Sequence, residues 1–316
     1  MGGGVVTDLL GLGVLLGVGL ALYLLVLIAW TAWGLTHPRR RTYAAAVARG
    51  IPGDPSELDE PRAFEDRVVR ALGHDLPVWE IGGDDADGPV VIMTPGWSDS
   101  RVGALVRLGV MVPNARRVIA WDPPGKGEAP GFCTLGTREV ALVRALADEV
   151  APREPVVLMG WSLGAGVSIA AAARSPGRFV GVVAEAPYRR AMTPARGVLR
   201  ARRLPHRANL GPAYALLGTL FGVGPAWRGY DRAAHAANLR CPLLVLHGAE
   251  DPVCPIGDGR AIASAAPQGR IVETENAGHN NLWTVASSRE RQTEAVAGFL
   301  RSVRGAAAGP APTIPA

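Results

Sequence analysis

The chain has 316 residues, a formal net charge of +5 and 48% hydrophobic residues, and roughly 265 residues behind its apolar N-terminus are enough for one large α/β core. Its three cysteines show neither metal-ligand spacing nor the even number that a disulfide framework requires, so we expect no metal and no other cofactor. The basic charge comes without a recognisable nucleic-acid-binding module, so we expect no nucleic-acid partner.

The first predicted element is an apolar helix. Leu9–Thr36 contains no charged residue, and at 1.5 Å per residue it would span roughly 40 Å, more than the about 30 Å hydrocarbon core of a bilayer. A cleaved signal peptide is the alternative. It is disfavoured because Asp8, and no Lys or Arg, precedes the run, and because the run is too long for a signal h-region. We therefore predict that residues 1–41 are a transmembrane anchor with a basic flank, in contact with the membrane through residues 9–36.

The flank of this helix predicts its orientation. Arg39–Arg41 follow the apolar run directly, and positive charge beside a span is retained on the cytoplasmic side. The main domain is therefore expected in the cytoplasm. Trp30 and Trp33 fit an interfacial position. The Gly13-x-x-x-Gly17 spacing is compatible with helix pairing and hence with a homo-oligomer.

Beyond residues 42–74, expected to be a linker or helical segment, strands alternate with helices. This alternation predicts a doubly wound, mostly parallel sheet in a domain of residues 75–304, followed by a disordered small-residue tail, 305–316. The predicted elements are strands at Val78–Ile81, Val90–Thr94, Val118–Asp122, Val156–Met159 and Phe179–Ala184, and helices at Thr137–Val150 and from Leu163 onward.

Residues 160–164 read Gly-Trp-Ser-Leu-Gly between an apolar run and an Ala-rich helical stretch. A sharp strand-to-helix turn of this kind exposes the Ser162 hydroxyl, and the glycines avoid collisions with neighbouring backbone. Ser162 then lies at a helix N-terminus, beside free N–H groups. The five residues alone would also suit a turn without chemistry. Their setting favours a nucleophile.

An acid and a base follow later in the chain. Asp251 comes after the apolar run that begins at Cys241, and His279 follows a further strand, Arg270–Thr274. Glu250 and Glu185 are alternative acids, but the Gly248-x-x-Asp251 spacing favours Asp251. The other histidines are less well placed than His279; His247 ends a strand and is interpreted as shaping the acid loop. The chain order is therefore Ser, Asp, His.

This order, with each residue just after a strand, resembles the α/β-hydrolase family over roughly residues 75 to 303. The segment Val90–Trp97 is similar to the family's strand and oxyanion loop, and Val118–Gly127 to its D-x-x-G-x-G loop, in which Asp122 is a scaffold residue. One departure is visible, because Pro95-Gly96 stands where the family usually has His-Gly.

The resemblance implies a serine hydrolase that cleaves carboxylic esters or related acyl compounds. Ser162 would attack the carbonyl, His279 would carry the proton, and Asp251 would orient the imidazole. The backbone N–H groups of Trp97 and Leu163 would form the oxyanion hole. Two alternatives remain open: an acyltransferase or serine peptidase with the same triad, and a non-catalytic, membrane-bound binding module.

A helical cap is expected at about residues 188–238, where the family carries insertions. From Tyr188 to Arg240 there are ten arginines and one acid, a formal charge of +9, interleaved with leucines and aromatic residues. We hypothesise that this cap faces anionic lipid and admits acyl-lipid or other apolar ester substrates, which would make the activity lipase-like. The alternative is that the arginines solvate a mobile lid.

Overall fold

The centre of the molecule is a mixed β-sheet. The computed structural model describes residues 2–204 and 206–305, without the side chains of residues 2–8 and 286–288. Within these residues lies an eight-stranded sheet with the order β1-β2-β4-β3-β5-β6-β7-β8. The strands are β1 (Phe64–Ala71), β2 (His74–Gly82), β3 (Val90–Thr94), β4 (Arg117–Trp121), β5 (Val156–Trp161), β6 (Gly181–Glu185), β7 (Leu243–Gly248) and β8 (Gly269–Thr274).

Strands β3 to β8 pair in parallel, whereas β1 pairs antiparallel with β2, and β2 with β4. Every residue of β3, β5, β6 and β7 is buried, since helices cover both faces of a parallel sheet and its central strands are apolar throughout. The prediction of a mostly parallel, doubly wound sheet is confirmed.

Two groups of helices cover the two faces. One apolar cluster joins α4 (Glu139–Val150), α5 (Leu163–Ala173), α8 (Arg232–Ala236) and α9 (Ile256–Ala265) to the sheet. The other joins α3 (Leu105–Met111) and α10 (Ala286–Ser302) to the opposite face, beside the short 3-10 turns η2 (Arg101–Ala104) and η3 (Val112–Asn114). The carboxyl ends of the parallel strands are left for the loops that carry the site.

Residues 42–74 differ from the expectation of a linker or helical segment. They contain the short helix α2 (Tyr43–Val47) and the turn η1 (Pro55–Glu57), but also strand β1, so the sheet begins before residue 75. β1 is an edge strand with four charged residues and several exposed positions. Charged residues are typical of protected sheet edges, and here they hide the apolar pattern from which the other strands were predicted.

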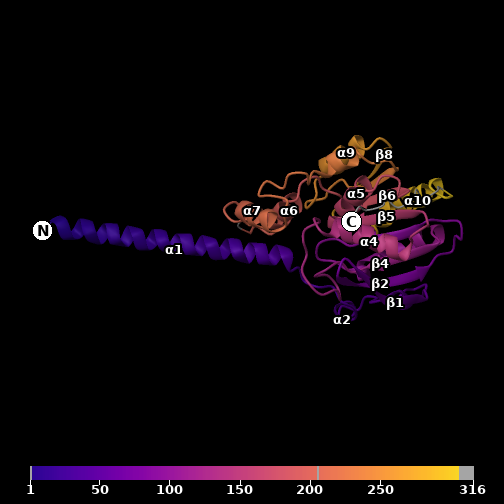
Figure 1. Ribbon diagram of the computed structural model, residues 1–316, viewed down its shortest axis with the longest axis horizontal. Helices are drawn as coiled ribbons and strands as arrows, with labels where there is room; N and C mark the ends of the chain where they lie inside the picture. The colour runs from indigo at the N-terminus through magenta and orange to yellow at the C-terminus, as the bar shows by residue number, and fades with distance from the viewer. Residues whose placement is uncertain (1, 205, 306–316) are drawn as a thin grey trace.

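Helix α1 (Gly2–Thr36) projects from the domain as a single long rod (Figure 1). Its segment Leu9–Thr36 is long and apolar enough to cross a membrane, a test that a signal sequence near an N-terminus also meets. The helix ends against the domain, where its last turns join a third apolar cluster together with residues that flank the site.

The expected cap lies between β6 and β7 and contains α6 (Thr193–Ala201), α7 (Leu210–Leu220) and α8. Helix α7 runs beside the last turns of α1 (Figure 1), and the side-chain amide of Asn209 donates to Thr31 Oγ1 over 2.8 Å. The tail expected to be disordered falls, apart from Gly305, outside the described residues.

Candidate active site

Ser162 occupies a strained turn between β5 and α5. Its backbone has φ 53° and ψ −113°, a conformation that residues with a side chain rarely adopt. A Cβ atom on Gly160 would collide with the backbone of Gly164, and one on Gly164 with the carbonyl oxygen of Thr94. The two glycines are therefore required for the turn that presents the serine.

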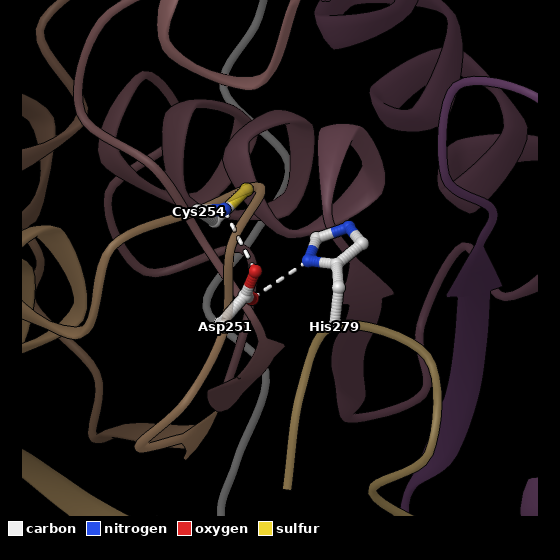
Figure 2. Close-up of side chains that lie close together, drawn as sticks. All are labelled: Asp251, Cys254 and His279. Carbon is white, nitrogen blue, oxygen red and sulfur yellow. Dashed lines mark hydrogen bonds and ion pairs between the residues drawn. The ribbon is translucent and has the colours of Figure 1, made fainter. Parts of the chain in front are cut away.

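Ser162, His279 and Asp251 form a continuous chain of hydrogen bonds. His279 Nε2 lies 3.0 Å from Ser162 Oγ, and His279 Nδ1 lies 2.7 Å from Asp251 Oδ2. Figure 2 shows the imidazole and the carboxylate facing each other. A neutral imidazole that donates from Nδ1 to the carboxylate leaves Nε2 free to accept the serine proton. The arrangement suits activation of a nucleophile.

The acid loop holds the Asp251 carboxylate firmly. Asp251 Oδ1 accepts hydrogen bonds from the backbone N–H groups of Val253 and Cys254, each 2.8 Å long, which leaves Oδ2 for His279. The Asp251 side chain is buried. Local loop geometry thus directs one oxygen of this carboxylate at the imidazole.

The two alternative acids have other environments. Glu250 is exposed to solvent. Glu185 is buried and paired with Arg107, whose Nε lies 2.8 Å from Oε2, and it also accepts a hydrogen bond from Trp283. A carboxylate with these partners is a structural ion pair. Of the three candidate acids, Asp251 alone contacts His279 among the described residues.

His247 lies beneath the acid loop, as its place in the sequence suggested. Its Nε2 is 2.8 Å from the carbonyl oxygen of Cys254 and 3.6 Å from Asp251 Oδ2. Burial lowers the pKa of His247, so the ring stays neutral near pH 7 and its Nε2–H donates to the carbonyl. His247 thereby supports the turn that carries Asp251.

Cys254 lies at the site, although no sequence motif indicates a role for it. It is fully buried and lies beside Asp251 and His279 (Figure 2). Its place three residues after Asp251 was the one available signal. Burial raises the pKa of the Cys254 thiol well above its ordinary value, so the group stays protonated and is a poor nucleophile.

Asp251, Cys254 and His279 also offer ligand atoms that lie within 4.8 Å of one another, as a metal site would. However, Asp251 Oδ2 and His279 Nδ1 are engaged with each other at 2.7 Å. The group fits the acid and base of a triad better than a metal centre.

The two expected oxyanion donors are the N–H groups of Trp97, in the loop after β3, and of Leu163. Leu163 is the first residue of α5, so its N–H has no partner within the helix. Among the described residues, no acceptor is found for the N–H of Leu163 or of Trp97. The two N–H groups therefore stay the predicted oxyanion donors.

The side chain of Lys126 holds the loop after β3, the predicted oxyanion loop, in place. Its Nζ donates to the carbonyl oxygens of Gly96, at 2.8 Å, and Pro95, at 3.3 Å, and the side chain is buried. Lys126 is the single lysine of the chain. Its position in the loop after β4 was the signal that sequence reasoning missed.

Asp122, the expected scaffold residue, accepts hydrogen bonds from two backbone N–H groups of the surrounding loops.

The same loop is tied to the end of α1 from the other side. Trp97 Nε1 donates to the carbonyl oxygen of Leu35 over 2.7 Å. The hydroxyl of Ser100 donates to the carbonyl oxygen of Arg41 over 2.5 Å. Arg41 also pairs with Asp99 at 3.1 Å. The end of the N-terminal helix therefore packs directly against a wall of the site.

Comparison with known proteins gives the same family for sequence and fold. The alpha/beta hydrolase family model matches residues 90–297. The pimeloyl-[acyl-carrier protein] methyl ester esterase of Chromobacterium violaceum is 27% identical over 227 residues, 61% of this chain and 87% of that protein. An esterase structure from Pyrococcus furiosus has a TM-score of 0.65 at 19% identity, covering 86% of this chain and 99% of that one. A membrane phospholipase A structure has a TM-score of 0.56 at 18% identity, covering 95% and 99%. The chain belongs to the alpha/beta hydrolase family.

Proposed function

We propose that the protein is a membrane-anchored serine esterase whose substrates are carboxylic esters with apolar, lipid-like acyl chains. The observation that carries this proposal is the hydrogen-bonded chain from Ser162 Oγ through His279 to Asp251. Its members follow three different strands and converge at the carboxyl edge of the sheet, where sites of open α/β folds lie.

In the proposed reaction, Ser162 Oγ attacks the ester carbonyl while His279 Nε2 takes its proton and then gives it to the departing alcohol. Asp251 stabilises the imidazolium that forms. The N–H groups of Leu163 and Trp97 bind the oxyanion, each contributing roughly 3 kcal/mol in comparable hydrolases. Water then attacks the acyl-enzyme with His279 as the base, which releases the acid and restores the serine.

The named relatives support an ester as substrate. One relative is a methyl ester esterase, and one structural neighbour is a membrane phospholipase A. The match to the latter leaves roughly 5% of this chain uncovered, fewer residues than α1 contains, so it reaches into the N-terminal helix. A lipid-like ester is therefore the substrate class that we favour.

The proposed location is a membrane, with the domain on the cytoplasmic side. Support comes from the apolar length of α1 and from Arg39 and Arg40, which are exposed where the helix meets the domain. Protease treatment of sealed inside-out vesicles tests the orientation. Digestion of the domain is expected, and complete protection would contradict it.

The substrate class is tested with full-length protein in liposomes and a series of esters with short, medium and long acyl chains. We expect turnover to rise with acyl length and to be absent in Ser162→Ala. Release of free acid distinguishes a hydrolase, whereas transfer to an added alcohol in preference to water would identify an acyltransferase. If no ester is turned over by the folded protein, the esterase proposal fails and a binding module becomes the better explanation.

A further inference from the structure

The cap covers one face of α1, and only near its C-terminal end. Leu9–Tyr23 are all exposed, whereas beyond them the covered positions recur every three or four residues. That spacing places them on one side of a helix. They are Leu24, Leu27, Ile28, Thr31, Ala32 and Leu35, followed by Thr36 at the end of the helix. Helix α7 lies along this stretch, fastened by the bond between Asn209 and Thr31.

The length of the uncovered part decides where α7 lies relative to a bilayer. The fifteen exposed residues Leu9–Tyr23 rise roughly 22 Å, but a hydrocarbon core of about 30 Å requires about 20 residues. A core segment that starts after Asp8 therefore extends to about Ile28, into the turns that α7 covers. Helix α7 must then lie at the depth where α1 leaves the hydrocarbon.

The surface of α7 suits that depth. Leu210–Leu220 contains no charged residue, and Leu216 and Leu220 are 44% and 63% exposed. On α1, Trp30 and Trp33 are 75% and 62% exposed, and aromatic side chains of membrane proteins mark the interface. Both helices thus expose apolar side chains.

The arginines of the cap divide into two groups. Arg189 pairs with Asp231, and Arg232 is buried against Tyr230, so these two serve the fold. The others near α7 are exposed, and no ion pair within the described part of the chain involves them. They are Arg196, Arg200, Arg202, Arg203 and Arg207. Arginines without an ion-pair partner beside an apolar helix are complementary to anionic headgroups.

From these observations, we infer that α7 is embedded in the headgroup layer of an anionic bilayer, beside the point where α1 emerges. Leu216 and Leu220 reach the acyl-chain boundary and the arginines contact phosphates. The inference rests on the proposed anchoring by α1 and adds a second membrane contact. Ala32, Leu217 and Leu163 belong to one cluster of buried apolar residues, so the embedded helix packs into the same core as the residue that follows Ser162.

The test places an environment-sensitive fluorophore on single added cysteines in full-length protein in liposomes that contain anionic lipid. The probes are Leu216→Cys and Leu220→Cys. Val18→Cys reports the centre of α1. Leu72→Cys, as exposed as Leu220 and located in the turn between β1 and β2, reports the aqueous side. The three native cysteines are buried, and a sample without an added cysteine corrects for their labelling.

We expect spin-labelled lipid to quench the probes at 216 and 220 several-fold more than the probe at 72, and soluble iodide to show the reverse order. If 216 and 220 behave like 72 while 18 is quenched by lipid, the protein is anchored and the inference about α7 is overturned. If 18 is also unquenched, the anchoring itself fails, and the inference with it. Replacing Arg200, Arg202 and Arg203 by Ser is expected to reduce lipid quenching at 220 without changing it at 18.

Discussion

The triad and the oxyanion loop lie side by side, but different parts of the chain hold them in place. The triad residues follow their own strands, and the bonds that orient Asp251 come from within its loop. The oxyanion loop is instead held by Lys126, 30 positions from Gly96, and by the end of α1 and the residues that follow it, through hydrogen bonds between residues 59 and 62 positions apart. The end of the N-terminal helix therefore supports one wall of the site, in addition to the anchoring role that we propose for the helix.

This difference predicts which substitutions impair the triad and which impair the oxyanion loop. Substitutions in the triad should abolish chemistry and leave the fold intact. Substitutions at the junction of α1 and the oxyanion loop should leave an activated serine that stabilises its transition state less well. The expected effects below run from the largest to the smallest.

Ser162→Ala is expected to lower kcat for ester hydrolysis by roughly 10⁶-fold, because the nucleophile is removed. Steady-state turnover in liposomes measures the loss. Ser168→Ala, a change of another buried serine, in the helix that follows Ser162, is the matched control and should retain activity. Comparable activity in the two variants would show that Ser162 is not the nucleophile.

Asp251→Asn is expected to lower kcat by roughly 10⁴-fold, because an amide in place of the carboxylate favours the wrong imidazole tautomer. Glu250→Gln changes the exposed neighbour and should have no effect. Equal losses in these two variants would show that the assignment of Asp251 as the acid is wrong. Measurement of kcat against pH should also show that the loss persists across the range in which the wild type is active.

Lys126→Met is expected to lower kcat by roughly 10- to 100-fold. The substitution removes charged hydrogen bonds to the carbonyls of Pro95 and Gly96, each contributing about 1.5 to 3 kcal/mol. Part of that energy will appear as a lower Tm, so thermal unfolding is measured on the same sample. An unchanged kcat alongside a lower Tm would show that Lys126 supports the fold and not the oxyanion loop.

Trp97→Phe removes the bond from the indole to Leu35 and is expected to cost about 1 kcal/mol, roughly fivefold in kcat with little change in KM. Trp227→Phe removes an equivalent indole-to-carbonyl bond within the cap, to Tyr214, and serves as the control. A greater loss of kcat in the cap variant would contradict the role given to the end of α1.

The strand ends and the triad were accessible from sequence because they depend on local patterns. The apolar runs locate the strands, and parallel strands bring their carboxyl ends together, so Ser162, Asp251 and His279 could be expected as neighbours. The choice of Asp251 over Glu250 depended on spacing. The structure supports that choice, because Asp251 contacts His279 whereas Glu250 is exposed to solvent.

The contacts of the oxyanion loop could not be read in the same way. Trp97, Ser100 and Lys126 bond to main-chain carbonyls, which have no residue signature, and the partners lie far away in the chain. Strand β1 was missed because its charges conceal its pairing. The covered face of α1 was missed because an apolar helix looks the same in sequence whether lipid or protein surrounds it.

The central claim is that Ser162 is an activated nucleophile within a membrane-anchored domain. The most direct measurement is labelling of membranes that carry the full-length protein with a fluorophosphonate probe, followed by identification of the modified peptide. We predict a single adduct on Ser162 that is lost in His279→Ala while circular dichroism shows an unchanged fold. An adduct on another residue, or equal labelling of Ser162 without His279, would contradict the claim.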